Sequence, residues 1–586
     1  MLTHVRRLLI HPRLPLGLAV VAMLTALPAL WAGWMGDDWA HRAVLGSHPP
    51  FVGVDPIRYL FRFLGPGEVN ENMASAGLLT WWADPGVRAA FFRPLSSATH
   101  LLDHLLWPDS AVLQHLHSLM WGGLMTWCGV RFLQEEGTTP LAAGLAAVFF
   151  AFEDAHAVPL TWIANRNALL TTTFSILTVH AFVRWRTTGD RRMWGLSMVS
   201  LALGLCAGEA ALGACAWMGA RVLTRERWSN LTSLAGPFVV VVVWRLAYDA
   251  LGFGADLSGL YIDPGATPDV WAGALVARWP VLAAGQLLSA PIDGWGVLPE
   301  SGRLAMSVAG LGVAVAFVAV AWPALKARPS ARTAALAFAF ILVPFTSTFP
   351  MDRLYTFASL ASALLIAEIV DHHAILEDPD PEVAPGAWTL RTWAIVGLLL
   401  WHGPVSGLAR PARVAATPLM GLIFDVAADT GPSDDTLEQQ TLVFIQANEF
   451  SAIYTYVKRS VPPHDHGRPR GIALLSTWWT DVKVTREDPY TLVITPEEGF
   501  LARPIDHLLR DPARKPFAVD DHVAHFGMDA HVRAVTGDGR PAVVAFRFSE
   551  PLEDETNRRF VTLGAAGVVD WTPPAVGETV VLPALF

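Results

Sequence analysis

The sequence predicts an α-helical polytopic membrane protein with about 11 transmembrane helices and a C-terminal soluble β-rich domain. Of its 586 residues, 53% are hydrophobic and 16% are charged, whereas charged residues make up about a quarter of an ordinary soluble domain. Long apolar runs recur up to residue 410, and shorter β-rich runs replace them further on. We therefore expect a transmembrane domain over residues 1–413 and a β-rich domain over residues 430–586.

The first apolar run covers residues 14–34, which is about the length needed to cross a hydrocarbon core, and it carries no charge. Arg6, Arg7 and Arg13 precede it, and it lacks a small-residue cleavage pattern. We interpret it as a retained span with a cytoplasmic N-terminus rather than as a signal peptide. The other predicted runs are 112–133, 139–153, 166–184, 193–207, 209–223, 232–251, 304–325, 333–349, 354–371 and 390–408.

Basic residues in the loops test this count, because loops rich in Arg and Lys stay on the cytoplasmic side. The basic residues within 184–192, 221–227 and 326–332 all come out cytoplasmic if the run at 270–290 is re-entrant or interfacial. Arg410 and Arg413 come out on the outside and are a mild exception. The same count of membrane crossings, starting from a cytoplasmic N-terminus, places the segment 35–111 and the C-terminal domain on the extracytoplasmic side. We expect an integral protein of a bacterial-type inner or plasma membrane.

Composition also argues against several classes of protein. The net charge of −10 and the absence of a strongly basic stretch argue against a nucleic-acid partner. The three cysteines, Cys128, Cys206 and Cys215, all lie within apolar runs. We therefore expect them to be small buried side chains rather than parts of a disulfide framework.

Two adjacent carboxylates, Asp37 and Asp38, follow the first apolar run and therefore lie at a membrane face. Like charges this close raise one another's pKa, and ionisable groups at such a place are costly unless chemistry uses them. We therefore take Asp37 and Asp38 as the catalytic candidates. The alternative is a solvated acidic loop that only ends the first span.

The predicted outer segment 35–111 contains an amphipathic helix near residues 91–107. Its leucines, such as Leu102, Leu105 and Leu106, recur at helical spacing. We expect this helix to lie on the membrane. The alternative is that its leucines pack against the helical bundle.

Further charged residues occur at the predicted outer ends of later spans. Arg166 begins the fourth run, where its planar guanidinium can hold a phosphate or pair with a carboxylate, and snorkelling to the interface is the alternative. Because all these groups face the same side as Asp37 and Asp38, we expect one polar cavity roofed by the first outer segment. The other candidates for this cavity are Arg93, His156, Glu209, Asp352, Arg353 and Tyr355.

Short motifs recur in a definite order over the membrane part: Asp37–Asp38, Phe92–Leu95, His156 with Trp162–Ile163, Arg166–Leu170, Gly208–Glu209 and Asp352–Tyr355. This order resembles the multispan glycosyltransferases of the GT-C superfamily, especially the protein O-mannosyltransferases and the tetratricopeptide-containing membrane mannosyltransferases. The resemblance covers most of residues 1–410. The chain departs from the family in its second outer loop, which carries Glu153–Asp154 and Val158, and no 34-residue helical repeat follows the membrane part.

The resemblance implies transfer of a sugar from a polyprenyl-phosphate donor to an acceptor protein, lipid or glycan on the extracytoplasmic face. Asp37 or Asp38 would then be the general base of an inverting hexosyltransferase. Arg166, Arg353 and Arg93 are the candidates for binding the donor phosphate. A divalent cation can bridge an aspartate to the phosphate, although the sequence does not demand one. The residues expected to support the cavity are His156, Glu209, Asp352 and Tyr355.

Beyond residue 436, short β-rich runs alternate with turn-forming Gly, Pro and Asp. We expect one unit of about 150 residues that holds the acceptor or steadies the first outer segment. His464, Asp465 and His466 lie in a stretch that we interpret as an exposed polar turn rather than a metal site. The predicted strands are 441–445, 472–475, 482–485, 490–494, 543–548 and 579–582.

Two other functions fit a protein with many spans. A transporter or lipid flippase would line a pathway with the same charged groups, but such folds often carry internal repeats, and this sequence shows none. A membrane scaffold that presents the β-rich domain would leave Asp37 and Asp38 without a role. Substitution of these aspartates by asparagine separates both hypotheses from that of a glycosyltransferase.

Overall fold

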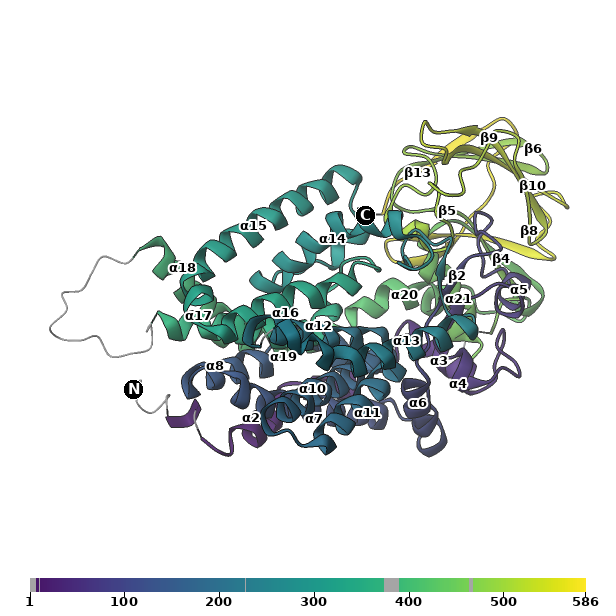
Figure 1. Cartoon of the computed structure of the whole chain (residues 1–586). Helices are drawn as coiled ribbons and strands as arrows, with labels where there is room; N and C mark the ends of the chain where they lie inside the picture. The colour runs from purple at the N-terminus through teal and green to yellow at the C-terminus, as the bar shows by residue number, and fades with distance from the viewer. Residues whose placement is uncertain (1–6, 10, 227, 374–388, 463–466, 586) are drawn as a thin grey trace.

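The computed structural model describes residues 7–9, 11–226, 228–373, 389–462 and 467–585. It shows a long body of helices with a β-rich region at one end, formed by the C-terminal part of the chain (Figure 1). The predicted polar turn at His464, Asp465 and His466 lies outside the described residues.

Among the described residues, five helical segments are long and apolar enough to cross a membrane, by length and composition. Several helices that coincide with predicted runs are short, such as α12 (Leu212–Arg225) with 14 residues and α17 (Ala358–His372) with 15 residues. A total of eleven spans therefore remains a prediction. The five segments are Leu14–Trp31, Pro140–Thr161, Ser229–Ala250, Glu300–Ala327 and Leu390–Thr430.

The helices pack around an apolar core in which aromatic rings from distant parts of the chain meet. Phe132 of α7 (Ala111–Glu136) contacts Trp217 of α12, which in turn contacts Phe357 just before α17. Close packing of this kind fixes the positions of the helix ends, which carry the polar loops. The other helices of the body are α2 (Leu14–Thr25), α8 (Pro140–Ala151), α10 (Arg166–Thr188), α11 (Arg191–Ala207), α13 (Ala235–Ala250), α14 (Pro268–Leu288), α15 (Glu300–Ala327), α16 (Pro329–Phe345), α18 (Leu390–Leu400), α19 (Ser406–Ala416) and α20 (Leu419–Thr430).

Helix α14 covers the run that the sequence predicts to be re-entrant or interfacial. The hydroxyl of Ser307 in α15 donates to the carbonyl of Ala277 in α14 at 2.7 Å, and a Cβ atom at Gly310 would meet the carbonyl oxygen of Pro280 at 2.4 Å. Ala277 of α14 contacts Ser307 of α15, and Pro280 lies next to Gly310. Because the residue numbers increase together, α14 and α15 run in the same direction. The segment 289–299 therefore returns the chain toward the start of α14, and the re-entrant or interfacial placement of this run remains a prediction.

The first outer segment is folded and is tied to a later part of the chain. Its strands β1 and β2 join β3 (Gly254–Asp256), which follows α13, in a small antiparallel sheet. This pairing holds the first outer segment over the ends of the helices. The elements of the segment are α3 (Asp37–Leu45), α4 (Pro56–Tyr59), β1 (Arg62–Leu64), α5 (Glu68–Ser75), β2 (Arg88–Ala90) and α6 (Pro94–Leu106).

Helix α6 is amphipathic, as predicted, but its polar face is the buried one. His100 and Asp103 are buried, whereas Leu102, Leu105 and Leu106 are 47%, 70% and 57% exposed. The alternative prediction, that these leucines pack against the bundle, is therefore wrong. Lipid tails and protein cores are equally apolar, so a stripe of leucines does not indicate which of the two it faces.

The C-terminal region contains a crossover helix as well as strands. Helix α21 (Glu449–Arg459) connects the parallel neighbours β4 and β5, which is the βαβ connection that parallel strands require. All the predicted strands are present, whereas β8, β9, β11, β12 and α21 were not predicted. The sheets have the orders β13-β6-β7-β10-β9-β8 and β12-β11-β4-β5. The strands are β4 (Thr441–Ala447), β5 (Gly471–Thr477), β6 (Val482–Asp488), β7 (Thr491–Pro496), β8 (His522–His525), β9 (Met528–Val535), β10 (Pro541–Phe548), β11 (Arg558–Gly564), β12 (Gly567–Asp570) and β13 (Thr579–Leu582).

The first outer segment contributes to the core of this C-terminal region. Trp81 is buried there, and its Nε1 donates to the carbonyl of Leu475 at 3.1 Å. The N–H of Ile472 donates to the carbonyl of Ala76 at 3.0 Å. Gly77 has a φ of +70°, and a Cβ atom there would lie 1.9 Å from the carbonyl oxygen of Ile472. Only glycine permits this close approach, which fixes the first outer segment to β5.

Candidate active site

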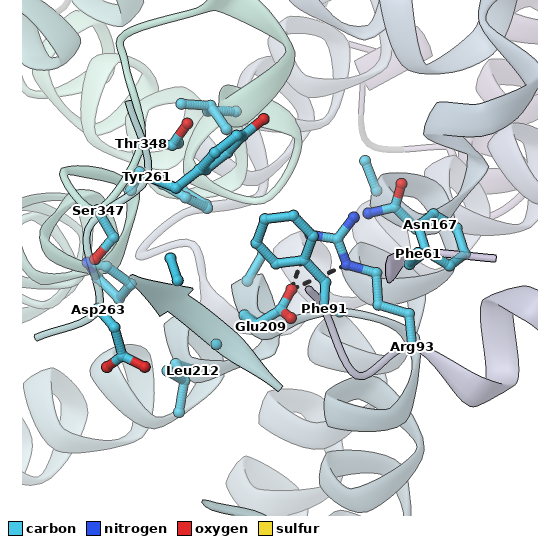
Figure 2. Close-up of a pocket in the computed structure, with 18 of the residues that line it drawn as sticks. Phe61, Phe91, Arg93, Asn167, Glu209, Leu212, Tyr261, Asp263, Ser347 and Thr348 are labelled. Atoms are coloured by element: carbon cyan, nitrogen blue, oxygen red, sulfur yellow. Dashed lines mark hydrogen bonds and ion pairs between the residues drawn. The ribbon is translucent and has the colours of Figure 1, made fainter. Parts of the chain in front are cut away.

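A cavity of about 540 Å³ lies between the first outer segment and residues of α10, α13 and α16. Four of the candidates predicted from the sequence line it: Asp37, Arg93, Glu209 and Arg353. Figure 2 shows Arg93 and Glu209 facing one another on one side of the cavity, with Asp263 on the other side. The structure therefore has a cavity beneath the first outer segment, but most of its lining is apolar and only some of the predicted residues reach it.

Asp37 is the first residue of α3 and lines the cavity. Gly36, with a φ of +51°, forms the turn that begins this helix, in a conformation that favours glycine. The hydroxyl of Tyr454 donates a hydrogen bond to Oδ1 of Asp37. Burial raises the pKa of Asp37, while the hydrogen bond from Tyr454 and the charges of Arg353 and Arg93 lower it, and the net change is a rise. A raised pKa makes this carboxylate a better proton acceptor.

Asp38, by contrast, does not line the cavity and is held by backbone N–H groups. Its Oδ2 accepts from the N–H of Met35 at 3.1 Å, and its Oδ1 accepts from the N–H of Ala164 at 2.6 Å. The side chain is buried, and this burial raises the pKa of Asp38 well above its ordinary value despite both hydrogen bonds. Asp38 therefore ties the start of α3 to the second outer loop.

Arg93 and Glu209 form an ion pair on one wall of the cavity (Figure 2). Nη2 and Nε of Arg93 lie 2.9 Å and 3.0 Å from the same oxygen, Oε2 of Glu209. The guanidinium also lies 4.6 Å from the ring centroid of Phe91, and the hydroxyl of Tyr248 donates to Oε1 of Glu209 at 3.4 Å. Both charged side chains are partly exposed, so they remain accessible from the cavity.

Arg353 presents a positive charge to the same cavity. Its Cζ atom lies 5.4 Å from the ring centroid of Trp162, and its Nε contacts Sδ of Met351 at 3.3 Å. In the described part of the chain, no ion pair joins Arg353 to a carboxylate. A guanidinium that has no carboxylate partner favours an anionic ligand whose oxygens can accept its hydrogen bonds.

Arg166 does not line the cavity. Its guanidinium is fully buried, with Nη1 2.5 Å from Oδ2 of Asp103. Nε donates to Oγ of Ser118 at 3.0 Å, and Nη2 donates to the carbonyl of Gln114 at 2.8 Å. These contacts occupy the guanidinium, so the structure shows the pairing with a carboxylate and leaves no place for a phosphate.

Three further candidates also lie outside the cavity. His156 and Tyr355 are buried among the helices. Asp352 forms an ion pair with Arg413, which also pairs with Asp154 at 2.6 Å. These residues connect helix ends and do not line the cavity.

Several residues that line the cavity were not predicted from the sequence. Arg245 and Asp263, which both line the cavity, form an ion pair at 3.0 Å. In the sequence, this part of the cavity is marked mainly by its tryptophans. Tryptophans are equally typical of the membrane–water interface, so they do not identify a binding site. Other residues of the lining carry buried polar atoms that have no hydrogen-bond partner among the described residues. These atoms are Nε1 of Trp162, Trp244 and Trp271, Nδ2 of Asn165 and Oγ1 of Thr348.

The described residues contain no group of three or more His, Cys, Asp or Glu side chains that could hold a metal ion. A divalent cation beside Asp37 would therefore need oxygen ligands from a bound phosphate as well as from the protein. The prediction that such an ion bridges the aspartate and the donor remains a prediction.

Comparisons with known proteins find a likeness of fold. No family model matches the chain, and no curated protein matches it. One similar solved structure is the archaeal oligosaccharyltransferase AglB from Archaeoglobus fulgidus in complex with an inhibitory peptide and a dolichol-phosphate, at 11% identity and a TM-score of 0.37. Others are ArnT from Cupriavidus metallidurans, at 12% identity and a TM-score of 0.36, and the arabinofuranosyltransferase AftD from Mycobacteria, at 18% identity and a TM-score of 0.33.

The matches cover different shares of the chains. They cover 78% of this chain and 64% of the archaeal chain, 77% of this chain and 89% of ArnT, and 90% of this chain and 41% of AftD. This chain thus spans less than two thirds of the length of the archaeal protein. Two of the three are transferases by name, an oligosaccharyltransferase and an arabinofuranosyltransferase.

Proposed function

We propose that this protein is a membrane glycosyltransferase that transfers a sugar from a polyprenyl-phosphate donor to a hydroxyl group of an acceptor. One observation carries the proposal: a single cavity contains the Asp37 carboxylate, with its raised pKa, the guanidinium groups of Arg93 and Arg353, and apolar walls. Such a transfer needs a proton acceptor, a group that stabilises the departing phosphate and a surface that accommodates a lipid. The cavity offers all three.

Asp37 is the proposed general base of an inverting transfer. Its carboxylate takes the proton of the acceptor hydroxyl while the hydroxyl oxygen attacks the anomeric carbon of the donor sugar. The new glycosidic bond forms as the bond between the anomeric carbon and the phosphate oxygen breaks, and the electron pair leaves with the phosphate. Asp38 is not proposed for this role, because it does not line the cavity and both of its oxygens accept backbone hydrogen bonds.

Arg353 and Arg93 are the proposed ligands of the donor phosphate. Both line the cavity, and both contribute attractive charge at Asp37, so they lie close to the proposed base. The phosphate gains negative charge as the sugar leaves, and guanidinium groups already in place stabilise that charge. Arg166 is no longer proposed, because Asp103 and other buried partners occupy its guanidinium.

The wall formed by α13 supports a lipid-linked donor. Val241 and Trp244 of this helix line the cavity, whereas Phe238, Val243 and Leu246 are 67%, 61% and 64% exposed on its outer side. The helix therefore separates the cavity from an apolar outer surface by a single layer. A polyprenyl chain can pass beside such a helix from the bilayer, while the phosphate and the sugar enter the polar part of the cavity.

The proposed topology places the cavity on the extracytoplasmic side of a bacterial-type inner or plasma membrane. The N-terminus is then cytoplasmic, and the segment 35–111 and the C-terminal domain 430–586 are extracytoplasmic. The distribution of basic residues in the sequence supports this orientation. We propose a hexose as the sugar and a protein, lipid or glycan as the acceptor.

Substitution of Asp37 tests the proposal. Membranes that contain the full chain are incubated with undecaprenyl-phosphate-linked radiolabelled hexoses, and transfer of label to lipid, glycan and protein is measured. Asp37→Asn preserves the size of the side chain and removes the base, so we expect transfer to fall about 10²- to 10⁴-fold.

The matched control is Asp109→Asn, because the Asp109 side chain belongs to the same outer segment and is 84% exposed. We expect this variant to transfer sugar at the wild-type rate. Wild-type rates in Asp37→Asn, or no transfer by the wild-type chain from any of the hexose donors, would refute the proposal.

A further inference from the structure

Tyr454 connects the C-terminal region to the proposed base. Its hydroxyl donates a hydrogen bond to Oδ1 of Asp37, although the two residues are 417 positions apart in the sequence. Tyr454 is buried and does not line the cavity, whereas Asp37 does. We propose that Tyr454 is a positioning residue for Asp37, so that the βαβ unit of the C-terminal region is a working part of the active site. This inference rests on the proposed function and extends it.

The local sequence explains why a tyrosine of the C-terminal region reaches this place. Strand β4 ends at Ala447, and Asn448 caps the following helix by accepting the N–H of Ser451 at 2.7 Å. Helix α21 then crosses between β4 and β5 and packs with its other side on α3 and α20. Tyr454 lies on the side that faces α3, one turn after Ser451, so its hydroxyl reaches the first residue of that helix.

Packing holds the ring of Tyr454 in place. The ring lies edge-to-face against Phe424 of α20, with centroids 5.7 Å apart. The same Phe424 ring lies against Phe450, with centroids 5.3 Å apart, and a Cβ atom at Gly36 would lie 3.2 Å from it. The turn that begins α3 and the ring that supports Tyr454 therefore form one packed unit.

Polar contacts fasten the same three helices together. Nδ2 of Asn448 donates to the carbonyl of Ile423 in α20 at 3.1 Å, and Nζ of Lys458 lies 2.5 Å from Oδ1 of Asp429. Nε1 of Trp39 in α3 donates to Oδ2 of Asp425 at 3.3 Å. With α3, α20 and α21 fixed to one another, the hydroxyl of Tyr454 meets Asp37 at a defined orientation.

The hydrogen bond has two consequences for a general base. It occupies one carboxylate oxygen and leaves the other for the proton of the acceptor. It also favours the ionised carboxylate, so it holds the pKa of Asp37 below the value that burial alone would impose. The charged and titratable groups around Asp37 are Tyr454 from α21, Arg353, Arg93 and the neighbouring Asp38, with Asp425 of α20 close to Tyr454.

Tyr454→Phe tests this role, because it removes the hydroxyl and keeps the ring that packs on Phe424. The matched control is Tyr456→Phe, on the same helix, because Tyr456 is also buried but its hydroxyl accepts from Arg468 rather than contacting Asp37. Both variants are made in the full chain and purified in detergent. A structural role shared by buried tyrosines would affect both variants alike.

The first readout is the pH dependence of carbodiimide modification at Asp37, measured by mass spectrometry. Carbodiimides modify the protonated carboxyl group, so the midpoint of the pH profile reports the pKa of Asp37. Loss of a hydrogen bond to the charged form raises this pKa, and we expect the midpoint of Tyr454→Phe to rise by about one pH unit. The midpoint of Tyr456→Phe is expected to match the wild type.

The second readout is the pH profile of kcat/KM for transfer from undecaprenyl-phosphate-linked hexoses. Its acid limb is expected to move to higher pH in Tyr454→Phe by the same amount, with kcat reduced and KM for the donor unchanged. An unchanged carbodiimide midpoint in Tyr454→Phe, or an equal shift in Tyr456→Phe, overturns the role of Tyr454 and leaves the proposed function standing. A wild-type chain that transfers no sugar overturns the proposed function, and the positioning role with it.

Discussion

Two arginines at the outer ends of helices show how differently the same residue type is used in this protein. Arg166 is fully buried, and Asp103, Ser118 and the carbonyl of Gln114 bind its guanidinium at 2.5 Å, 3.0 Å and 2.8 Å. Arg353 lies over the ring of Trp162 and lines the cavity, and it forms no ion pair within the described ranges. The first arginine holds elements together, and the second remains available to a ligand.

The adjacent aspartates repeat this contrast within one helix turn. Asp38 uses both oxygens to accept backbone N–H groups, and Asp37 lines the cavity with one oxygen bound by Tyr454. In both comparisons, the residue whose partners are all supplied by the protein supports the fold. The residue that has polar atoms without a partner in the protein lies in the cavity, where a substrate can bind those atoms.

The largest expected effect is a loss of stability on substitution of Arg166, whose guanidinium is fully bound by groups of the protein. Arg166→Leu removes the guanidinium from the buried carboxylate of Asp103 and leaves it with Nδ1 of His117, 2.6 Å away, so we expect the free energy of unfolding to fall by about 3–5 kcal/mol. Denaturation of the purified chain in detergent, followed by tryptophan fluorescence, measures this change. Below its unfolding temperature, the variant is expected to retain sugar transfer.

The double variant Arg166→Leu/Asp103→Leu separates the loss of the ion pair from the cost of an unpaired charge. Removal of both partners leaves no buried charge, so this variant is expected to lose less stability than the single one. A single variant as stable as the wild type, with transfer abolished, would reverse the roles assigned to Arg166 and Arg353.

A somewhat smaller effect is expected for Arg353, which remains available to a ligand, and this effect is on the rate of sugar transfer rather than on stability. Arg353→Gln removes a charge from the cavity without stranding a buried carboxylate, so we expect transfer to fall about 10²- to 10³-fold with the unfolding transition unchanged. Arg58→Gln, at an exposed arginine of the first outer segment, is the control and should leave both properties unchanged. If Arg353→Gln lost as much stability as Arg166→Leu and still transferred sugar at the wild-type rate, the result would contradict the different roles assigned to the two arginines.

Local patterns in the sequence predicted many elements correctly. The β-rich runs at 441–445 and 543–548 coincide with β4 and β10, and the two aspartates stand directly after the first apolar run, at the start of α3. These features depend on neighbours in the sequence, such as periodic apolar residues and turn-forming residues. For the same reason Asp37 could be predicted as a candidate before its surroundings were known.

Contacts between distant residues decided the rest. Arg166 and Arg353 both stand at helix ends in charged motifs, and only the position of Asp103 shows that the first is saturated. The hydrogen bond from Tyr454 crosses 417 positions, and no local signal in α21 indicates it. In α6, the spacing of leucines predicts the helix but not the exposure of Leu105, because lipid and core are equally apolar.

The most direct test of the account is a cryo-EM structure of the full chain with undecaprenyl phosphate bound. The account predicts the phosphate in the cavity beside Asp37, within hydrogen-bond distance of the Arg353 guanidinium, about 3 Å, with the lipid chain leaving past α13. A phosphate bound away from this cavity, with Arg353 making no contact to it, would contradict the account.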